Sequence, residues 1–370
     1  MRKGTTKSAN QNKINCAWIA SYYGPYYSNF VCSMLSFEEE MKKRGNKTIY
    51  ILPAEAENFS WIELFKKENA TIYFIPYKPH SLSNVIQLRK IFKKEKINLI
   101  YSHMCGWDFT ARFAAPFTPI IWHMHMRVLV SDWKHKLKNW LKFRIIGIGK
   151  VHHIAVSSPT ADAINSLNPH NKCAFIPNAL QFDRLGELPE RNRNGEPYKL
   201  LIFGWAPIVK GLDIALDACE SINQETVKVE LIVSSQDKTY TYINERYKEI
   251  PEWLKLVPPT DKIAELYASV DCMVSASRAE GFSYAIAEAI YTGLPIVYSD
   301  IPGTLWTSDF ESTSIFESGN PASLISAINR VMENGISLES QQNNRKKMEE
   351  LYSMDAWVNQ VMDVINSIKI

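Results

Sequence analysis

Two glutamates eight residues apart have the setting in this chain that best suits chemistry. Glu280 follows an apolar run, 268–277, that we expect to be a strand, and Glu288 lies in the helix expected next, which Gly293 and Pro295 end. A helix N-terminus presents unpaired N–H groups and a positive dipole end, which suit a phosphate or a sugar hydroxyl. Glu280 would lie beside those donors, and Glu288 could accept hydrogen bonds from a diol such as ribose. Spacing alone favours an ordinary surface loop and helix, because short motifs recur by chance.

The residues around these glutamates resemble the donor-site signature of glycosyltransferase family 4. Residues 278–288 read Arg-Ala-Glu-Gly-Phe-Ser-Tyr-Ala-Ile-Ala-Glu, and Gly-Leu-Pro-Ile-Val follows at 293–297. The resemblance continues upstream in the family's order, through a Val-Ser strand, an Ile-x-Asn segment, and a strand followed by a Lys-Gly helix start. These segments are 154–157, 175–180 and 200–213. The first 120 residues resemble the family more weakly, through one histidine segment.

Lys210 opens a helix directly after a glycine-containing turn, where a cation and free N–H groups would meet a diphosphate. A solvated surface lysine is the alternative. In the family this lysine is paired with an arginine five residues earlier, where this chain has Trp205, so one phosphate contact is missing and Arg278 is expected to replace it in part. The resemblance implies a donor site formed by Gly204, Trp205, Lys210, Arg278, Gly281, Phe282, Ser283 and Glu288.

His123 and His125 lie near the end of an expected strand, and strand alternation places both on one face. A metal pair would need a third ligand, and the local sequence offers none. The resemblance implies a histidine that touches the donor sugar; His125 matches it best and His123 is the second candidate. We therefore expect Glu280 and His125 to be the catalytic residues. His103 ends the preceding strand and either faces the acceptor or is a buried structural histidine.

The loop 21–29 joins the first expected strand to the first helix, where a Rossmann-like domain holds a phosphate. It has a single Gly24, then Pro25 and several tyrosines. These tyrosines either stack on a sugar or pack between domains; we favour binding, with Gly24 and Tyr26 as acceptor-side candidates. No Asp-x-Asp occurs in the sequence, which argues against the metal-dependent glycosyltransferase fold. We expect no metal and no cofactor besides the nucleotide-sugar substrate.

The chain of 370 residues is long enough for two domains, and its charge is divided unevenly between its halves. Residues 1–185 carry a net charge of +14 and residues 186–370 one of −11. No run reaches the roughly 18 apolar residues of a membrane helix, and six scattered cysteines indicate buried free thiols. We expect a cytoplasmic protein. The basic half contains no recognisable nucleic-acid-reading module, so nucleic-acid binding is the weakest alternative.

Strand and helix patterns alternate along both halves, which predicts parallel sheets covered by helices. We expect an α/β protein of two doubly wound, Rossmann-like domains facing a cleft, the GT-B architecture, which the resemblance implies independently. The predicted divisions are an acceptor-side domain at 1–182, a polar linker at 183–198, a donor domain at 199–352 and a last helix at 353–370 that packs back on the first domain.

Residues 133–150 combine a tryptophan-rich helical face with many lysines. This pattern suits an anionic membrane surface, and an ordinary helix with a solvated lysine face is the alternative.

Together the features of the whole sequence predict a retaining glycosyltransferase that moves a sugar from a nucleotide-sugar to a glycan or lipid-linked acceptor in bacterial surface polysaccharide biosynthesis. It would be cytoplasmic and peripheral on the inner face of the membrane. The alternatives are a non-catalytic nucleotide-sugar-binding or scaffold subunit, which Trp205 motivates, and a nucleotide-sugar epimerase of the same architecture.

Overall fold

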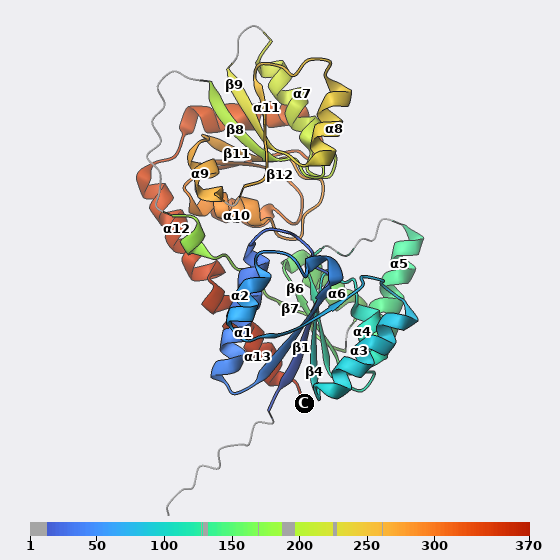
Figure 1. Cartoon of the computed structure of the whole chain (residues 1–370). Helices are drawn as coiled ribbons and strands as arrows, with labels where there is room; N and C mark the ends of the chain where they lie inside the picture. Colours follow the sequence, from blue (N-terminus) through green and yellow to red (C-terminus); the bar gives the residue numbers. More distant parts are fainter. Residues whose placement is uncertain are drawn as a thin grey trace, which may run out of the picture.

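The computed structural model describes residues 13–126, 128, 132–168, 170–186, 197–224, 228–260 and 262–370. Two α/β domains face each other along the long axis of the molecule (Figure 1). Each domain is a parallel sheet covered on both faces by helices, which confirms the predicted fold class. Most of the predicted linker, 187–196, lies outside the described residues.

The first domain contains a seven-stranded parallel sheet in the order β3-β2-β1-β4-β5-β6-β7. One face is covered by α1, α2 and α13, the other by α3 and α4. Its strands are β1 (Asn15–Ala20), β2 (Lys47–Pro53), β3 (Thr71–Ile75), β4 (Leu99–His103), β5 (Ile120–Met124), β6 (Val151–Ala155) and β7 (Ala174–Phe175). Its helices are α1 (Asn29–Lys43), α2 (Ile62–Lys67), α3 (Leu82–Lys94), α4 (Asp108–Ala114), α5 (Trp133–Trp140) and α6 (Ser158–Leu167).

The second domain repeats the plan with six parallel strands in the order β10-β9-β8-β11-β12-β13. Here α7, α8 and α11 cover one face and α9, α10 and α12 the other. The strands are β8 (Tyr198–Phe203), β9 (Val229–Ser234), β10 (Leu254–Val257), β11 (Cys272–Ser275), β12 (Ile296–Ser299) and β13 (Thr313–Phe316). The helices are α7 (Leu212–Ile222), α8 (Asp237–Arg246), α9 (Ile263–Ala268), α10 (Tyr284–Tyr291), α11 (Pro321–Asn334) and α12 (Leu338–Tyr352), and the helix that follows, α13 (Met354–Ser367), packs on the first domain.

The chain passes between the domains twice, and the two passages are adjacent. Leu180 forms an isolated parallel bridge with Ser353, and its N–H donates to the carbonyl of Tyr352 over 2.8 Å. Beyond this point α13 packs into the core of the first domain, where Trp357 lies near Trp18. The predicted return of the last helix to the first domain is therefore confirmed.

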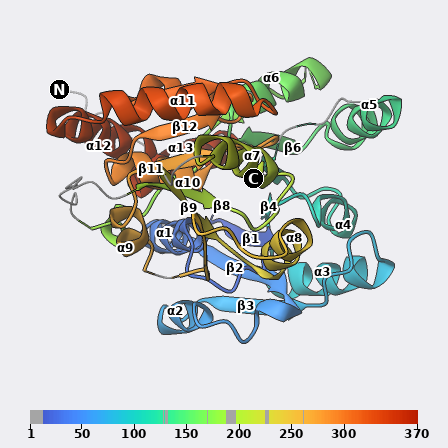
Figure 2. The same cartoon turned by 90° about the horizontal axis from the view of Figure 1, so that it is seen from above.

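The order of the strands determines where a ligand can lie. In each sheet the direction of winding reverses beside the first strand, between β1 and β4 and between β8 and β11. Ligands of doubly wound sheets bind at such a point, outside the carboxyl ends of the strands. The loops that follow strands of both sheets line one cavity, so the carboxyl ends of the two sheets meet between the domains. In the view from above, the two sheets overlap (Figure 2).

The helical segment predicted within 133–150 is an α-helix only in its first part. The α-helix α5 ends at Trp140, and a π-helix, Leu141–Ile146, continues it. Lys142 and Phe143 on this π-helix are buried, whereas α5 has no buried residue. Among the described residues, every helix is too short or too polar to cross a membrane.

Candidate functional site

The loops after β8 and β11 form an ion pair between the predicted donor residues Lys210 and Glu280. Gly211 has a positive φ of 67°, and a Cβ at this position would overlap the carbonyl oxygen of Ala276 at the end of β11. Glycine therefore lets the two loops touch. The Glu280 carboxylate also accepts a hydrogen bond from the Ser277 hydroxyl over 2.8 Å. The resulting ion pair is largely buried, with 15% of the Lys210 side chain and 11% of the Glu280 side chain exposed.

Glu288 lies on α10 and is almost completely buried, with 8% of its surface exposed. One carboxylate oxygen accepts a hydrogen bond from the Asn29 amide over 2.6 Å, and the other accepts one from the Tyr267 hydroxyl over 2.9 Å. Burial raises the pKa of this carboxyl above its usual value, and the nearby Arg184 guanidinium and the two hydrogen bonds oppose the rise. Asn29 belongs to the first domain, so this contact crosses the cleft.

A cavity of ≈ 250 Å³ lies between the domains and is open to Glu288. The first residues of α1 and α10 both line it, so two helix N-termini, each the positive end of a dipole, converge there. The Ser28 side chain does not cap α1 and bonds to the Tyr22 hydroxyl instead. The lining residues are Tyr26, Tyr27, Ser28, Asn29, Arg184, Phe203, Trp205, Ser234, Gln236, Pro259, Thr260, Ile263, Leu266, Tyr284 and Glu288.

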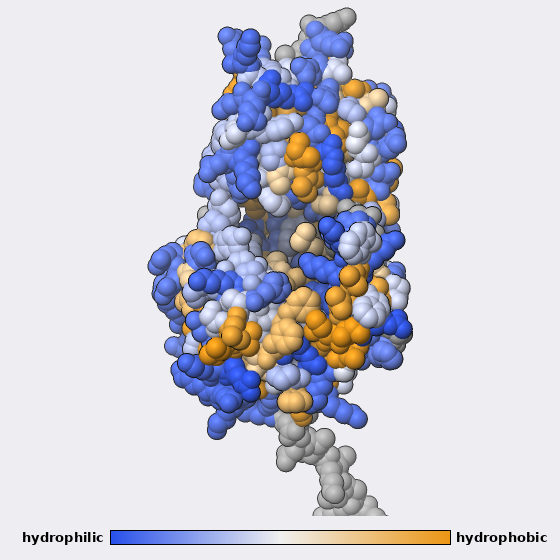
Figure 3. Space-filling view, turned by 90° about the vertical axis from the view of Figure 1, so that its right-hand side faces the viewer, coloured by the Kyte–Doolittle hydropathy of each residue, from blue (hydrophilic) through white to orange (hydrophobic). Residues whose placement is uncertain are grey.

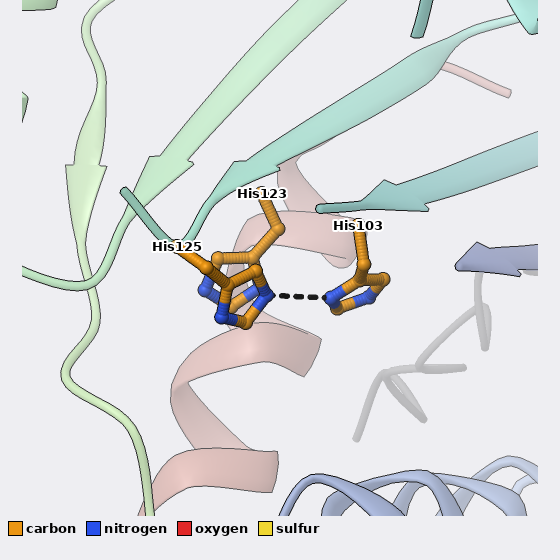
Figure 4. A group of neighbouring side chains, drawn as sticks. All are labelled: His103, His123 and His125. Atoms are coloured by element: carbon orange, nitrogen blue, oxygen red, sulfur yellow. Dashed lines mark hydrogen bonds between the residues drawn. The ribbon is translucent and has the colours of Figure 1, made fainter. Parts of the chain in front are cut away.

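His103, His123 and His125 form one cluster at the ends of β4 and β5 (Figure 4). His103 is the register partner of His123, and strand alternation places His125 on the same face. The His125 Nε2 and His103 Nδ1 atoms are 3.0 Å apart and share a hydrogen bond. Burial lowers the pKa of His125 to about 4 and those of the other two well below their usual value. All three are therefore neutral at pH 7.

This cluster corrects the expectation that no third ligand accompanies His123 and His125. One ring nitrogen of each histidine lies within 4.8 Å of the others, so the three could hold a metal ion. Two features favour a packed hydrogen-bonded cluster. The His123 and His125 rings stack with centroids 4.5 Å apart, and the Nδ1 atom of His123 bonds to the Tyr101 hydroxyl over 2.8 Å.

The two predicted catalytic residues approach each other from opposite domains. A Cβ on Gly281 would overlap the carbonyl oxygen of His125, so the backbones of the two loops are in contact. Glu280 directly precedes Gly281 in this loop. The structure therefore places the carboxylate loop of the second domain against the histidine loop of the first, with the Lys210–Glu280 ion pair alongside.

Three predicted donor residues have other structural roles. The Arg278 guanidinium pairs with both Asp213 oxygens over 2.7 Å and donates to the carbonyl of Ile208, so the expectation that it replaces the missing phosphate contact lacks support. The Phe282 ring stacks on Trp306 within the core, with centroids 4.9 Å apart. The Gly204 carbonyl accepts a hydrogen bond from Thr239, which makes this residue part of the packing between β8 and α8.

The remaining predicted residues lie at or near the cleft. Trp205 lines the cavity, and its ring centroid is 5.0 Å from the Lys210 ammonium. Tyr26, predicted on the acceptor side, lines the same cavity as Glu288. The Gly24 carbonyl accepts a hydrogen bond from the Trp61 indole over 3.0 Å. Ser283 caps α10, with its hydroxyl accepting from the N–H of Ile286 over 3.4 Å.

Three residues that line the cavity or hydrogen-bond to Glu288 were not indicated by sequence analysis. Asn29, Tyr267 and Arg184 come from α1, from α9 and from the passage between the domains. Asn29 also accepts the backbone N–H of Gln181 over 3.0 Å, so one amide connects α1, the interdomain passage and Glu288. A polar residue that begins a helix is the only sequence signal at Asn29, and it does not specify a partner in the other domain.

The comparisons with known proteins agree with this geometry. The sequence family described as Glycosyltransferase Family 4 matches residues 34–184, and the one described as Glycosyl transferases group 1 matches residues 197–334. No curated protein sequence matches the chain.

Solved structures of the same architecture are similar over almost the whole chain. A glycosyltransferase from Rickettsia africae ESF-5 has a TM-score of 0.77 and 14% identity, with 97% of this chain and 99% of that chain covered. Sucrose-phosphate synthase from Thermosynechococcus elongatus has a TM-score of 0.76 and 14% identity, with coverages of 96% and 98%. Anabaena HepE, solved with UDP and glucose, has a TM-score of 0.75 and 16% identity, with coverages of 96% and 100%.

At such identities the likeness shows the fold alone. The two Rossmann-like domains and the cleft between them define the GT-B class of glycosyltransferases. The chain belongs to this class as a glycosyltransferase family 4-like protein, with one family matched on each domain. It is accordingly a transferase enzyme, and its reaction is glycosyl transfer.

Proposed function

We propose that the protein transfers a sugar from a nucleotide-sugar to a glycan or lipid-linked acceptor, with retention of the anomeric configuration. The observation that carries the donor assignment is the cavity at Glu288, into which the N-termini of α1 and α10 converge. Such a site suits a diphosphate next to a ribose. HepE and the pneumococcal transferase GtfA were solved with UDP, which supports a nucleoside diphosphate as the leaving group. Retention follows from the family resemblance.

In this proposal each side chain has one task. Glu288 accepts hydrogen bonds from the ribose hydroxyls, and Lys210 with the helix N-termini stabilises the negative charge that develops on the departing diphosphate. Glu280 and His125 hold the sugar from the two sides of the cleft. Because the pKa of His125 is about 4, it acts as a neutral hydrogen-bonding group at pH 7. In the transfer step the acceptor oxygen bonds to the anomeric carbon on the face from which the nucleoside diphosphate departs. The bond between that carbon and the diphosphate oxygen breaks, and the acceptor proton passes to the departing diphosphate.

Calorimetry with UDP, GDP and ADP, together with a transfer assay, tests this proposal. The wild type should bind at least one of the three nucleotides, and Lys210→Ala and Glu288→Ala should each bind it at least tenfold more weakly while remaining folded. Lys262→Ala is a matched control, since Lys262 forms an exposed ion pair on α9. Unchanged affinity in both site variants would refute the donor site. Product NMR with the correct acceptor should show a retained anomer.

The assays also separate the alternative functions. Tight nucleotide binding without turnover of any nucleotide-sugar would favour a non-catalytic subunit. Conversion of a nucleotide-sugar into its epimer without an acceptor would favour an epimerase.

We further propose that the first domain binds the anionic inner face of the membrane. Large apolar side chains are exposed on the face that carries α3, α4 and α5 (Figure 3). Trp133 is 69% exposed and Phe117 85%, and lysines and arginines alternate with such residues. Apolar side chains among basic ones suit an anionic lipid surface. The exposed apolar residues of this face, which we call the α3–α5 face, are Leu82, Ile86, Phe113, Phe117, Trp133, Leu137, Trp140, Leu141, Ile145 and Ile148.

Lys142 does not belong to this face, contrary to the sequence prediction. Its ammonium is buried and pairs with Asp108 over 2.7 Å, and the Ser102 hydroxyl donates to the other Asp108 oxygen. Burial acts against the charge on Lys142, but the Asp108 carboxylate outweighs it and raises the pKa of the ammonium. This ion pair attaches the π-helix, and through it α5, to the end of β4.

Vesicle co-sedimentation tests membrane binding. The wild type should bind vesicles with phosphatidylglycerol at low salt and bind less as salt rises, because the attraction is screened. Each basic residue near the surface contributes about 1 kcal/mol, so Lys134→Ser, Lys136→Ser, Lys138→Ser and Arg144→Ser combined should abolish binding. The same four changes at Lys238, Lys248, Lys255 and Lys346 of the second domain are the control. A wild type that ignores anionic vesicles at low salt would refute membrane binding.

A further inference from the structure

One positively charged side chain that lines the cavity, that of Arg184, does not come from a loop at the end of a strand. Arg184 ends a short 3₁₀ turn, Phe182–Arg184, in the passage between the domains, and its side chain lines the cavity. Its guanidinium carbon lies 5.4 Å from the centroid of the Tyr27 ring, which also lines the cavity. Arg184 therefore faces the space between α1 and Glu288.

The turn that carries Arg184 is held by both domains. The Phe182 ring stacks on Tyr291 of α10 with centroids 4.3 Å apart, and Leu185 is buried in the core of the second domain. On the other side, the Gln181 N–H donates to the Asn29 side chain at the start of α1. Because its backbone is fixed at these points, the arginine enters the cavity from a constrained position.

The charges around the cavity leave Arg184 available to an anion. Lys210 is already paired with Glu280, and Arg278 with Asp213. Within the described residues, no carboxylate lies within ion-pair distance of Arg184, although its charge lowers the pKa of Glu288 more than any other neighbour does. A half-buried guanidinium beside two helix N-termini is suited to a phosphate, which it can bind through two parallel hydrogen bonds.

We infer that Arg184 binds the diphosphate of the nucleotide donor. This inference rests on the proposed function, because it takes the nucleotide to lie in the cavity. The passage between the domains then contributes a substrate contact of its own, and the arginine supplies positive charge in a cavity where Trp205 provides an uncharged ring. Glu288 beside it would hold the ribose, so the guanidinium and the carboxylate bind adjacent parts of one ligand.

The test compares a nucleoside with its diphosphate by calorimetry, using uridine and UDP, or the base that the wild type binds. Arg184→Ala should weaken binding of the diphosphate about 10- to 100-fold, the size of one charge-assisted contact, and leave binding of the nucleoside unchanged. Arg184→Lys should recover part of the loss, because it keeps the charge without the planar fork. Arg246→Ala is the control: Arg246 also lies over an aromatic ring, 5.2 Å from the Tyr247 centroid, but it pairs with Asp217 and Glu220 and does not line the cavity.

The outcomes are distinguishable. Unchanged diphosphate affinity in a folded Arg184→Ala variant would overturn the inference and leave the proposed function intact. An equal loss for nucleoside and diphosphate would also overturn it, because the guanidinium would then contact the nucleoside. A wild type that binds no nucleoside diphosphate would instead refute the proposed function itself. Thermal melting without nucleotide confirms that each variant is folded.

Discussion

Replacing Glu288 by glutamine should stabilise the protein and weaken nucleotide binding. The carboxylate is buried, and its two hydrogen-bond donors, Asn29 and Tyr267, are uncharged. Glutamine can keep both bonds, accepting from the Asn29 amide and donating to the Tyr267 hydroxyl, and it has no charge to desolvate. The variant loses one of the acceptor oxygens proposed to bind the ribose.

The raised pKa of Glu288 sets the sign and the pH range of the effect. A carboxyl whose pKa is raised by folding stabilises the protein fully below the unfolded value, about 4.5, and this contribution is lost as pH rises through the folded value. Each pH unit of the rise corresponds to about 1.4 kcal/mol, or roughly 3–6 °C in Tm for a domain of this size. At pH 7–8 the Tm of Glu288→Gln should therefore exceed that of the wild type by about this amount for each unit by which folding raises the Glu288 pKa. The Tm values of the two proteins should converge below pH 4.5.

Differential scanning fluorimetry across pH 4–8 measures this difference, and calorimetry with the bound nucleoside diphosphate measures the functional loss. Glu265→Gln is the control, since the Glu265 side chain is 71% exposed and its ion pair with Lys262 lies at the surface. It should change Tm by no more than about a degree, because exposed ion pairs contribute little. Equal or lower Tm for Glu288→Gln at pH 7–8, or a gain that persists undiminished at pH 4, would show that burial of the charge is not what raises this pKa.

Three further predictions concern the cleft. Glu280→Gln and His125→Ala should lower the transfer rate at least 100-fold and change nucleotide affinity only a few-fold; wild-type rates in both would remove them from the catalytic site. Gly281→Ala should reduce transfer at least tenfold, because the added Cβ overlaps the His125 carbonyl and separates the loops; Gly319→Ala, whose Cβ meets nothing within 4 Å and whose positive φ of 87° strains only its own turn, is the control for an alanine that does not meet a loop of the other domain. Transfer should persist in excess EDTA, and activity that is lost there and restored by magnesium or manganese would contradict metal independence.

The sequence predicted the fold well because its evidence is local. The alternation of strands and helices along both halves was predicted correctly, since an apolar period and a stop signal lie within a single segment of sequence. The short helices α2, α4 and α9 were missed, because six or seven residues are too few to show a period. The π-helix was missed; the ion pair that buries its Lys142 joins it to Asp108, 34 residues earlier, and a local pattern does not show such a contact.

The residues of the candidate site likewise fall into those with a local sequence signal and those whose role depends on distant contacts. Lys210, Glu280, Glu288 and the histidines lie at strand ends or in the helix that follows, within local motifs. The structure pairs Lys210 with Glu280, brings the loop of Glu280 against that of His125 and places Glu288 at the cavity. Arg278 carries the same kind of motif, but its partner Asp213 lies on α7 and determines where its charge is used. Asn29 and Arg184 have no motif, because their roles arise only where α1, α10 and the interdomain passage meet. A single sequence does not record such a meeting.

The return of α13 to the first domain has a consequence for biosynthesis. Trp357, Val361 and Ile365 lie in the same core as Trp18 and Phe37, at the opposite end of the chain. While the ribosome is still translating the second domain, the first sheet exposes the apolar surface that α13 later covers. The first domain is thus synthesised first but completed only when α13, the last helix, has been made. Until then the nascent chain exposes this apolar surface, to which chaperones can bind. A premature stop codon before Met354 would leave the second domain's strands intact and damage the first domain.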